Sequence, residues 1–289
     1  MPNSTSATET QIRKPSKIFL PKRKNARVKK RLRMKTPTGS RAKGEKITRM
    51  NKKGEAYSAL ASCYEYLMTS CDYEQWSQKV CNEVKRRAPS KKGADVACGS
   101  GHFTRALKRA GFDVFGADLS PEMLNEAARL TAKEGLSIPF VLEDMKKFRA
   151  NGKLGFVTVI NDGVNYLKPE ETDKAFSAFA KALAKGGLLL FDVSSEEKLK
   201  NTLGNNMFGE VDEDVSYLWF NSFDGEKVTM DLTFFLRKGE LYERRDETHV
   251  QYVHRKNDLI SSLEKAGFRE IEVTASETGD RLTFSALRG

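Results

Sequence analysis

The chain has 289 residues, of which 39% are hydrophobic and 31% charged. This length fits one large folded domain with an appendage, and the hydrophobic fraction is sufficient to build a core, which excludes a wholly disordered protein. No apolar run is long enough to span a membrane, and the start lacks the apolar stretch of a secretory signal. Four cysteines without a C-x-x-C pair or a nearby His cluster exclude a disulfide framework, and they predict reduced thiols, no metal site and a reducing, cytoplasmic location.

The net charge of +11 is unevenly distributed along the chain. Residues 1–53 carry 18 of the 50 Lys and Arg residues and two acidic residues, a net charge of +16, whereas residues 54–289 carry a net charge of −5. The first segment has almost no hydrophobic periodicity, so we predict a basic extension that is disordered alone or ordered on a partner. Its cations, in residues 13–53, predict binding to RNA or a ribonucleoprotein, with a merely solubilising tail as the alternative.

The same extension leaves a second location open. An Arg-rich, acid-poor start with Ser and Thr is typical of mitochondrial and other organellar targeting segments. Against this, prolines at positions 15, 21 and 37 would interrupt an amphipathic helix.

Regular structure is predicted from residue 55 onward. Apolar residues recur at helical spacing from Tyr57 to Met68, and a second helix is predicted after Asp72. Strands and helices then alternate, which predicts a parallel sheet with helices on both faces. The predicted strands cover residues 94–97, 114–117, 138–142, 156–160 and 188–193, and the predicted helices cover residues 102–110, 121–134 and 170–184.

The pattern changes after Ser194. Three alternating strands, with Gly225 and Gly239 in the turns between them, predict an antiparallel cap inserted over residues 194–253. These strands cover residues 215–223, 227–237 and 242–253, and they are followed by a helix over 256–266 and strands over 268–273 and 281–287. The sequence therefore predicts two parts, the basic extension 1–53 and an α/β domain over 54–289 that contains the cap.

A glycine loop joins the first strand of the alternating region to its first helix. It reads Asp95-Val96-Ala97-Cys98-Gly99-Ser100-Gly101, and glycines in this position let a ligand approach the backbone and the N–H groups of the helix. Asp118 follows Gly99 by 19 residues, at the end of the second strand, where a carboxylate can accept hydrogen bonds from both ribose hydroxyls. Thr104 stands where the dinucleotide fingerprint needs glycine, and no phosphate loop is present, so NAD and ATP are disfavoured.

The loop resembles motif I of class I S-adenosylmethionine-dependent methyltransferases, with Ala97 where that family often has its first glycine. Three further segments resemble later motifs of the family in the right order: residues 115–124 the ribose-binding motif, Glu143-Asp144-Met145 the adenine-binding position, and residues 184–191 the turn into the fifth strand. The resemblance covers roughly Tyr57 to the end of the chain. It implies a Rossmann-like fold, S-adenosyl-L-methionine as methyl donor and S-adenosyl-L-homocysteine as product.

Within the family the chain is similar to small capped members, such as sugar N-methyltransferases and related uncharacterised bacterial methyltransferases. Residues 63–68, 161–167 and 248–250 carry this likeness. It implies that the helix containing Tyr64 is a lid over the cofactor.

We expect the site residues to fall into two groups. The cofactor-binding group is Tyr64, Asp95, Ala97, Cys98, Gly99, Gly101, Asp118, Leu119, Met123, Asp144, Met145 and Asn161. The catalytic group is His249 as candidate base, Tyr166 beside the methyl group and Asp162 at the end of a buried strand. Each has a purely structural alternative: a core histidine, a core tyrosine, and a turn-forming Asn-Asp-Gly.

Three functions remain open from the sequence. The first is an active methyltransferase tethered to RNA or a ribonucleoprotein, such as the ribosome, by its basic arm. The second is a methyltransferase-like binding or assembly factor with little or no catalysis, and the third is a soluble small-molecule N- or O-methyltransferase. The glycine loop shows no obvious defect, which disfavours an inactive domain, and Asn161-Asp162-Gly163-Val164 replaces the Asn-Pro-Pro-Tyr type of motif, which disfavours methylation of base amino groups.

Overall fold

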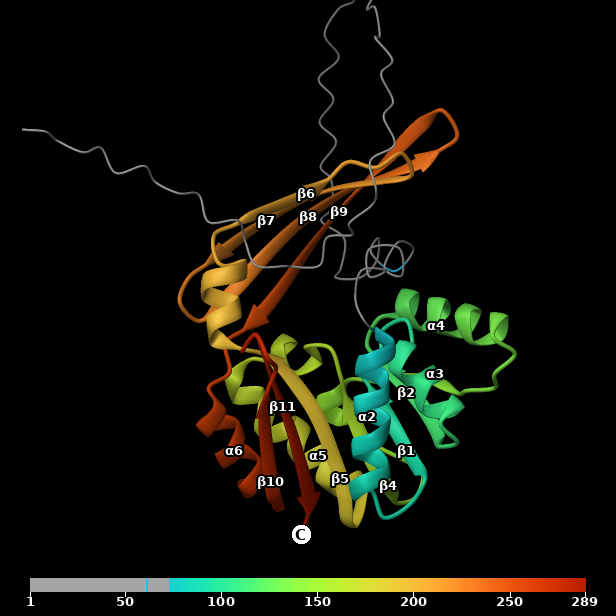
Figure 1. The fold of residues 1–289 in the computed structure, drawn as a ribbon, viewed down its shortest axis with the longest axis vertical. Helices are drawn as coiled ribbons and strands as arrows, with labels where there is room; N and C mark the ends of the chain where they lie inside the picture. The colour runs from blue at the N-terminus through green and yellow to red at the C-terminus, as the bar shows by residue number, and fades with distance from the viewer. Residues whose placement is uncertain (1–60, 62–72) are drawn as a thin grey trace, which may run out of the picture.

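The computed structural model describes residue 61 and residues 73–289. The basic extension and the predicted helix around Tyr64 therefore lie outside the described residues. Within the described part, the chain forms a seven-stranded sheet and a four-stranded sheet (Figure 1). No helix of this part is long and apolar enough to cross a membrane.

The larger sheet has the strand order β10-β11-β5-β4-β1-β2-β3. Strands β1 to β5 run parallel, whereas β11 runs antiparallel to both of its neighbours. Their bounds are β1 Lys92–Val96, β2 Asp113–Asp118, β3 Phe140–Leu142, β4 Leu154–Val159, β5 Leu183–Ser194, β10 Phe268–Ala275 and β11 Arg281–Arg288. Strand β3 is shorter than predicted because Pro139 has no N–H to donate to a ladder.

Helices cover both faces of this sheet, as the strand–helix alternation predicts. Helices α2 (Tyr73–Arg87) and α3 (His102–Arg109) pack on one face around Phe156, while α5 (Thr172–Ala182) and α6 (Lys256–Lys265) pack on the other around Val157. Successive residues of β4 thus enter opposite cores, because side chains alternate across a strand. Helix α4 (Pro121–Lys133) lies against β2 and β3. The predicted α/β fold is confirmed.

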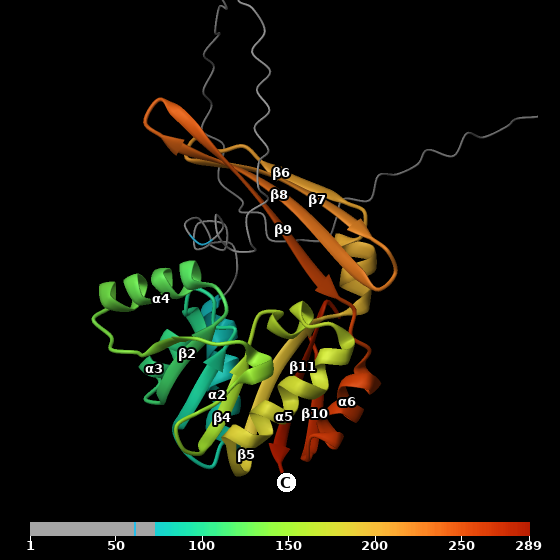
Figure 2. The same ribbon diagram turned by 180° about the vertical axis from the view of Figure 1, so that it is seen from behind.

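The four-stranded sheet is the predicted antiparallel cap. It is built from β6 (Met207–Glu210), β7 (Val215–Phe223), β8 (Lys227–Lys238) and β9 (Leu241–Tyr252), after a π-helix, η6 (Lys198–Leu203). Leu199 and Leu203 of η6 pack against apolar residues of β8, including Phe234. Figures 1 and 2 show this cap standing over the carboxyl ends of the parallel strands. In open α/β sheets, ligands bind at those ends.

A short 3-10 helix, η4 (Gly163–Tyr166), follows β4 and is fastened to both sheets. Asn165 donates to the carbonyl of Tyr252 at 3.0 Å and accepts from the backbone N–H of Ser194 at 2.9 Å. His254 Nε2 lies 3.1 Å from the carbonyl oxygens of both Val164 and Leu167, so this nitrogen carries a proton and donates. Burial lowers the pKa of His254, which favours a neutral ring here. The segment that carries Tyr166 is therefore held in one position.

Two further 3-10 helices, η3 (Met145–Lys147) and η5 (Pro169–Glu171), complete the connections around the carboxyl ends of the strands.

Candidate active site

The glycine loop is a tight turn with a left-handed backbone. Ala97, Gly99 and Gly101 have φ values of 52°, 54° and 76°. Ala97 carries a Cβ in this conformation, which costs roughly 1–2 kcal/mol and must be offset by the surrounding contacts. No atom lies within 4 Å of the position where a Cβ on Gly99 would project. The loop thus offers bare backbone to a ligand that lies on it.

A cavity of about 310 Å³ lies over this loop, at the carboxyl ends of β1, β2, β3 and β4. Most of the predicted site residues line it, namely Ala97, Cys98, Gly99, Asp118, Leu119, Met123, Asp144, Met145, Asn161 and Tyr166. Cys98 is a free thiol, and burial raises its pKa well above the usual range, so it stays protonated and packs as a small apolar group.

Four predicted residues do not line the cavity. Gly101 is the N-cap of α3, and a Cβ there would meet Ala127 and Phe140 at 3.1 and 3.2 Å. Asp95, Asp162 and His249 are buried behind the wall. The predicted roles of these four residues at the ligand therefore stay predictions. The predicted lid residue Tyr64 lies outside the described residues.

Asp118 presents a carboxylate to the cavity in a fixed orientation. Its Oδ2 accepts the backbone N–H of Gly99 at 2.8 Å, and its Oδ1 accepts that of Ser120 at 2.9 Å. A carboxylate has about four acceptor sites, so two remain for other donors. A ribose supplies two hydroxyls as such donors. Burial raises the pKa of Asp118, and the two N–H groups partly oppose this rise.

The neighbouring wall suits an adenine ring. Leu119 is a large apolar side chain, yet it is 68% exposed. Met145, at the start of η3, also lines the cavity. Asp144 caps η3 by accepting the N–H of Lys146 at 2.9 Å through Oδ1. Asp144 therefore acts as a helix cap; its Oδ2 lies 3.8 Å from Lys146 Nζ and keeps acceptor sites that an adenine amino group could use.

Asp95 of β1 links this strand to α3 and to β4 beneath the glycine loop. It accepts hydrogen bonds from Thr104 Oγ1 at 2.6 Å and from Thr158 Oγ1 at 2.7 Å. It is 2% exposed, and this burial raises its pKa to about 6.

Substituting Asp95 by asparagine is expected to change the pH dependence of stability. Because the folded pKa is raised, this carboxyl contributes stability that is fully present below pH 3.8 and is lost as pH rises through about 6. The loss amounts to at most about 3 kcal/mol, at 1.36 kcal/mol per pKa unit. Urea unfolding over this pH range should show the decline in the wild type relative to Asp95→Asn. Parallel curves for the two proteins would contradict it.

A buried ion cluster fixes the turn after β4. Arg281 Nη1 lies 2.7 Å from Asp162 Oδ1 and 2.5 Å from Asp192 Oδ2. Asp192 Oδ1 also accepts the backbone N–H groups of Asn161 and Asp162, which have φ values of 74° and 65°. Asn and Asp tolerate this left-handed conformation better than most residues. The turn-forming role of Asn-Asp-Gly is therefore present, and it aims Asn161 at the cavity.

The same cluster argues against Asp162 as a catalytic base. Burial alone would raise its pKa, but the positive charges of Arg281 and Lys198 bring it down to about 2. A carboxylate held in ion pairs with so low a pKa is a poor base near neutral pH. Sequence reasoning missed Asp192 and Arg281; an acid inside the apolar run 188–193 was the available signal.

Tyr166 connects the cavity to a pair of buried residues on the cap. Its hydroxyl lies 3.0 Å from His249 Nδ1, and His249 Nε2 lies 3.0 Å from Glu247 Oε2. His249 and Glu247 are only 3% and 1% exposed. When Glu247 is ionised its carboxylate can only accept, and in that state Nε2 carries the ring proton and Nδ1 accepts the phenolic proton of Tyr166. Glu247 was not foreseen; the period-two spacing of Glu247 and His249 places both on one face of β9.

Aromatic rings form another side of the cavity. Tyr73, in the first turn of α2, and His102, the first residue of α3, both line it with ring centroids 4.2 Å apart. Rings and carboxylates are favourable neighbours for a sulfonium cation. The sequence analysis singled out Tyr64 as a lid residue and did not consider Tyr73, which directly follows Asp72 at the start of the second predicted helix.

Fold and site together define a Rossmann-like nucleoside-binding domain, and comparisons with known proteins define its family. A methyltransferase domain model matches residues 94–187. The YqeM protein of Bacillus subtilis (strain 168), named provisionally as a methyltransferase, is 34% identical over 243 residues, covering 80% of this chain and 97% of the relative. The chain belongs to the S-adenosylmethionine-dependent methyltransferases.

Solved structures agree with this assignment. The crystal structure of an S-adenosylmethionine-dependent methyltransferase from Clostridium acetobutylicum ATCC 824 has a TM-score of 0.73 at 30% identity, covering 81% of this chain and 99% of the other. The sugar N-methyltransferase KedS8 from Streptoalloteichus sp ATCC 53650 shares the fold, with a TM-score of 0.69 at 22% identity, covering 86% and 99%. S-adenosylmethionine is thus the cofactor, and the residues present fit it: bare loop backbone at Gly99, a ribose acceptor in Asp118 and an apolar adenine face at Leu119.

Proposed function

We propose that the protein methylates an N–H or O–H group placed beside Tyr166, and that the proton of that group leaves through Tyr166 to His249. The observation that carries this proposal is the 3.0 Å contact between Tyr166 Oη and His249 Nδ1, directed from the cavity into a buried base. A structural pair of buried polar groups would also be hydrogen-bonded, but here the tyrosine lines the cavity while the histidine is buried behind it.

The hydrogen bonds that connect Tyr166, His249 and Glu247 set the direction in which the proton moves. Since the phenolic proton points to His249, the phenolic oxygen can accept a hydrogen bond from the methyl acceptor through a lone pair. As the acceptor loses its proton to Tyr166, the phenolic proton passes to Nδ1. The imidazolium that results lies against the carboxylate of Glu247, which stabilises its charge as the aspartate does in a catalytic triad.

Holding the cofactor and the methyl acceptor in place contributes the rest of the rate enhancement. When bound, S-adenosylmethionine provides an electrophilic methyl group on a sulfonium. Asp118 holds its ribose, and Asn161 and Tyr166 stand at the end of β4, where the acceptor must enter in line with the methyl group. Holding two reactants in this way can contribute several kcal/mol, roughly 7–11 in favourable cases. Mass spectrometry of the methylated product tests the proposal: the new methyl group is expected on nitrogen or oxygen, and a methyl group on carbon or sulfur would refute it.

We further propose that residues 13–53 tether the enzyme to RNA or a ribonucleoprotein. The support is the net charge of +16 in residues 1–53, joined to a domain whose net charge is −5. The acceptor would then belong to, or lie near, that particle.

Neutralising the densest part of the arm should test this tether in the full chain. The variant replaces the nine Lys and Arg residues between Lys22 and Lys35 by glutamine. Each phosphate contact to a single strand contributes about 0.7 to the slope of log affinity against log salt concentration, so the slope should fall by as much as about 6. An unchanged slope in anisotropy titrations with labelled RNA would reject the tether.

A small-molecule acceptor is the second candidate. One observation favours it: the fold is shared with a sugar N-methyltransferase. Under this alternative the arm only targets or solubilises the enzyme, and the arm variant keeps full activity on its acceptor.

A further inference from the structure

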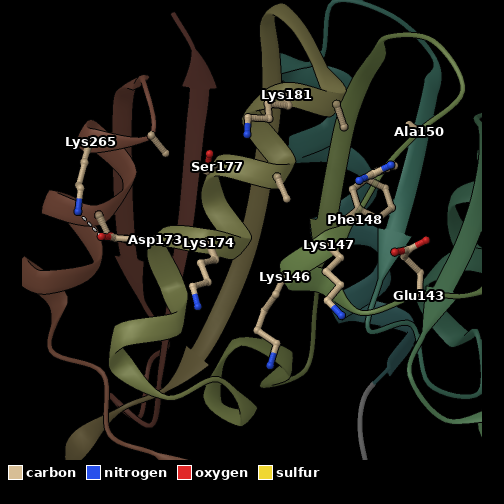
Figure 3. A pocket seen from close by; sticks show the side chains of 15 residues that line it. Glu143, Lys146, Lys147, Phe148, Ala150, Asp173, Lys174, Ser177, Lys181 and Lys265 are labelled. Atoms are coloured by element: carbon tan, nitrogen blue, oxygen red, sulfur yellow. Dashed lines mark hydrogen bonds and ion pairs between the residues drawn. The ribbon is translucent and has the colours of Figure 1, made fainter.

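A basic groove lies on the helical face of the domain, next to the cofactor cavity. It has a volume of about 1140 Å³, with α5 as its floor, residues 143–150 on one side and α6 on the other. Glu143 and Lys146 line both the groove and the cofactor cavity, so the two are neighbours. Six basic side chains and two acidic ones line the groove: Lys146, Lys147, Arg149, Lys174, Lys181 and Lys265, with Glu143 and Asp173 (Figure 3).

Most of these cations are not neutralised by the fold. Lys146 pairs with Glu171 at 2.9 Å, and Lys265 pairs with Asp173. The other four, Lys147, Arg149, Lys174 and Lys181, are exposed and form no ion pair with any residue that the structure describes. This local excess of positive charge contrasts with the domain as a whole, whose net charge is −5.

The four cations are distributed along the groove. Lys174 and Lys181 are seven residues apart on α5, which is two turns, so they share a face about 10 Å apart along the axis. Lys147 ends η3, and Arg149 follows two residues later. In Figure 3, Lys146, Lys147 and Lys174 point the same way. A single phosphate would need converging donors, whereas cations spread in this manner suit phosphates spaced along a strand.

We infer that this groove binds the phosphate backbone of single-stranded RNA. The choice of RNA among polyanions rests on the proposed tether, since the arm would already bring RNA to the domain. The groove is concave, and none of the large apolar side chains exposed on the described surface lines it, which disfavours an anionic membrane. The one aromatic residue in its wall, Phe148, is 3% exposed and offers no face to a base. Recognition is therefore of the backbone and is independent of sequence.

The test is a set of salt titrations on the full chain with a fluorescein-labelled oligouridylate. The groove variant is Lys147→Ala, Arg149→Ala, Lys174→Ala and Lys181→Ala together. The control variant replaces four exposed lysines elsewhere, on or near α2 and α4, and changes the net charge equally: Lys79, Lys85, Lys91 and Lys133 to Ala. None of the groove substitutions touches the cofactor cavity, so unchanged affinity for S-adenosylhomocysteine shows that the variant is folded.

The groove variant should reduce the salt slope by about 3, at about 0.7 per contact, and weaken binding at least about tenfold at moderate salt. The control should change neither quantity. Equal effects of both variants would overturn the inference, as would groove-dependent binding to anionic vesicles with RNA binding unchanged. The arm variant separates the two proposals: if it alone lowers the slope, the groove fails and the tether stands, and if the groove variant alone lowers it, the reverse holds.

Discussion

Asp118→Ala is expected to weaken the binding of S-adenosylhomocysteine severely, to the limit of detection or beyond. In the wild type the carboxylate is held by the N–H groups of Gly99 and Ser120, and its two remaining acceptor sites face the cavity. Each hydrogen bond from a ribose hydroxyl to a charged group contributes about 1.5–3 kcal/mol, so two of them contribute about 3–6 kcal/mol. This corresponds to a loss of affinity of roughly a hundredfold to ten-thousandfold. Isothermal titration calorimetry measures it directly.

A matched control lies on the same strand. Asp113 begins β2, is exposed and is far from the cavity end, so Asp113→Ala should leave the affinity unchanged. Thermal unfolding of both variants distinguishes lost binding from lost folding, since Asp118 also satisfies two backbone donors. Undiminished affinity in Asp118→Ala would remove this residue from the ribose-binding role.

His249→Ala is expected to lower turnover by roughly a hundredfold to ten-thousandfold, the usual contribution of a positioned base. Binding of S-adenosylhomocysteine should stay within about twofold, because His249 does not line the cavity, and its effect on chemistry passes through Tyr166. The assay is transfer of the tritiated methyl group from S-adenosylmethionine at saturating acceptor. Tyr166→Phe combined with His249→Ala should cost little more than either alone, since the two act in one path.

The controls for this prediction come from the same strand. Thr248 neighbours His249 but faces the other side of β9, and Thr248→Ala should keep full turnover. Removing His249 also deletes the contact of Nε2 with the buried Glu247, so Glu247→Gln provides a variant with the imidazole intact and the carboxylate charge removed. Turnover that is normal in both His249→Ala and Glu247→Gln would return His249 to a structural role.

Much of the fold follows from local patterns in the sequence. The bounds of β7, Val215–Phe223, match the prediction, because alternation and the glycine turn mark both of its ends. Strand β6 was missed, since its four residues lie at an edge and carry little apolar periodicity. Strand β5 begins at Leu183, earlier than expected, because Leu183 pairs with Leu154 before the irregularity at Gly186. That pairing is a tertiary contact with no local signal.

The cofactor-binding residues could also be predicted from local patterns. The glycine loop, Asp118 and Asp144 lie at the ends of β1, β2 and β3, which follow one another along the chain and are neighbours in the sheet. The acceptor side was readable only in part. His249 and Tyr166 were singled out separately, yet their 3.0 Å contact joins residues 83 positions apart, and Glu247 gains its role only through that contact. The ion pair of Asp162 with Arg281, 119 positions away, likewise had no signal in the sequence.

A crystal structure with S-adenosylhomocysteine bound tests the central claim most directly. We expect the ribose diol within about 3 Å of the Asp118 carboxylate, a hydrogen-bonding distance. The adenine should lie between Leu119 and Met145, and the sulfur should face Asn161 and Tyr166. A nucleoside bound outside this cavity, or with its sulfur turned away from Tyr166, would contradict both the cofactor site and the proton path built on it.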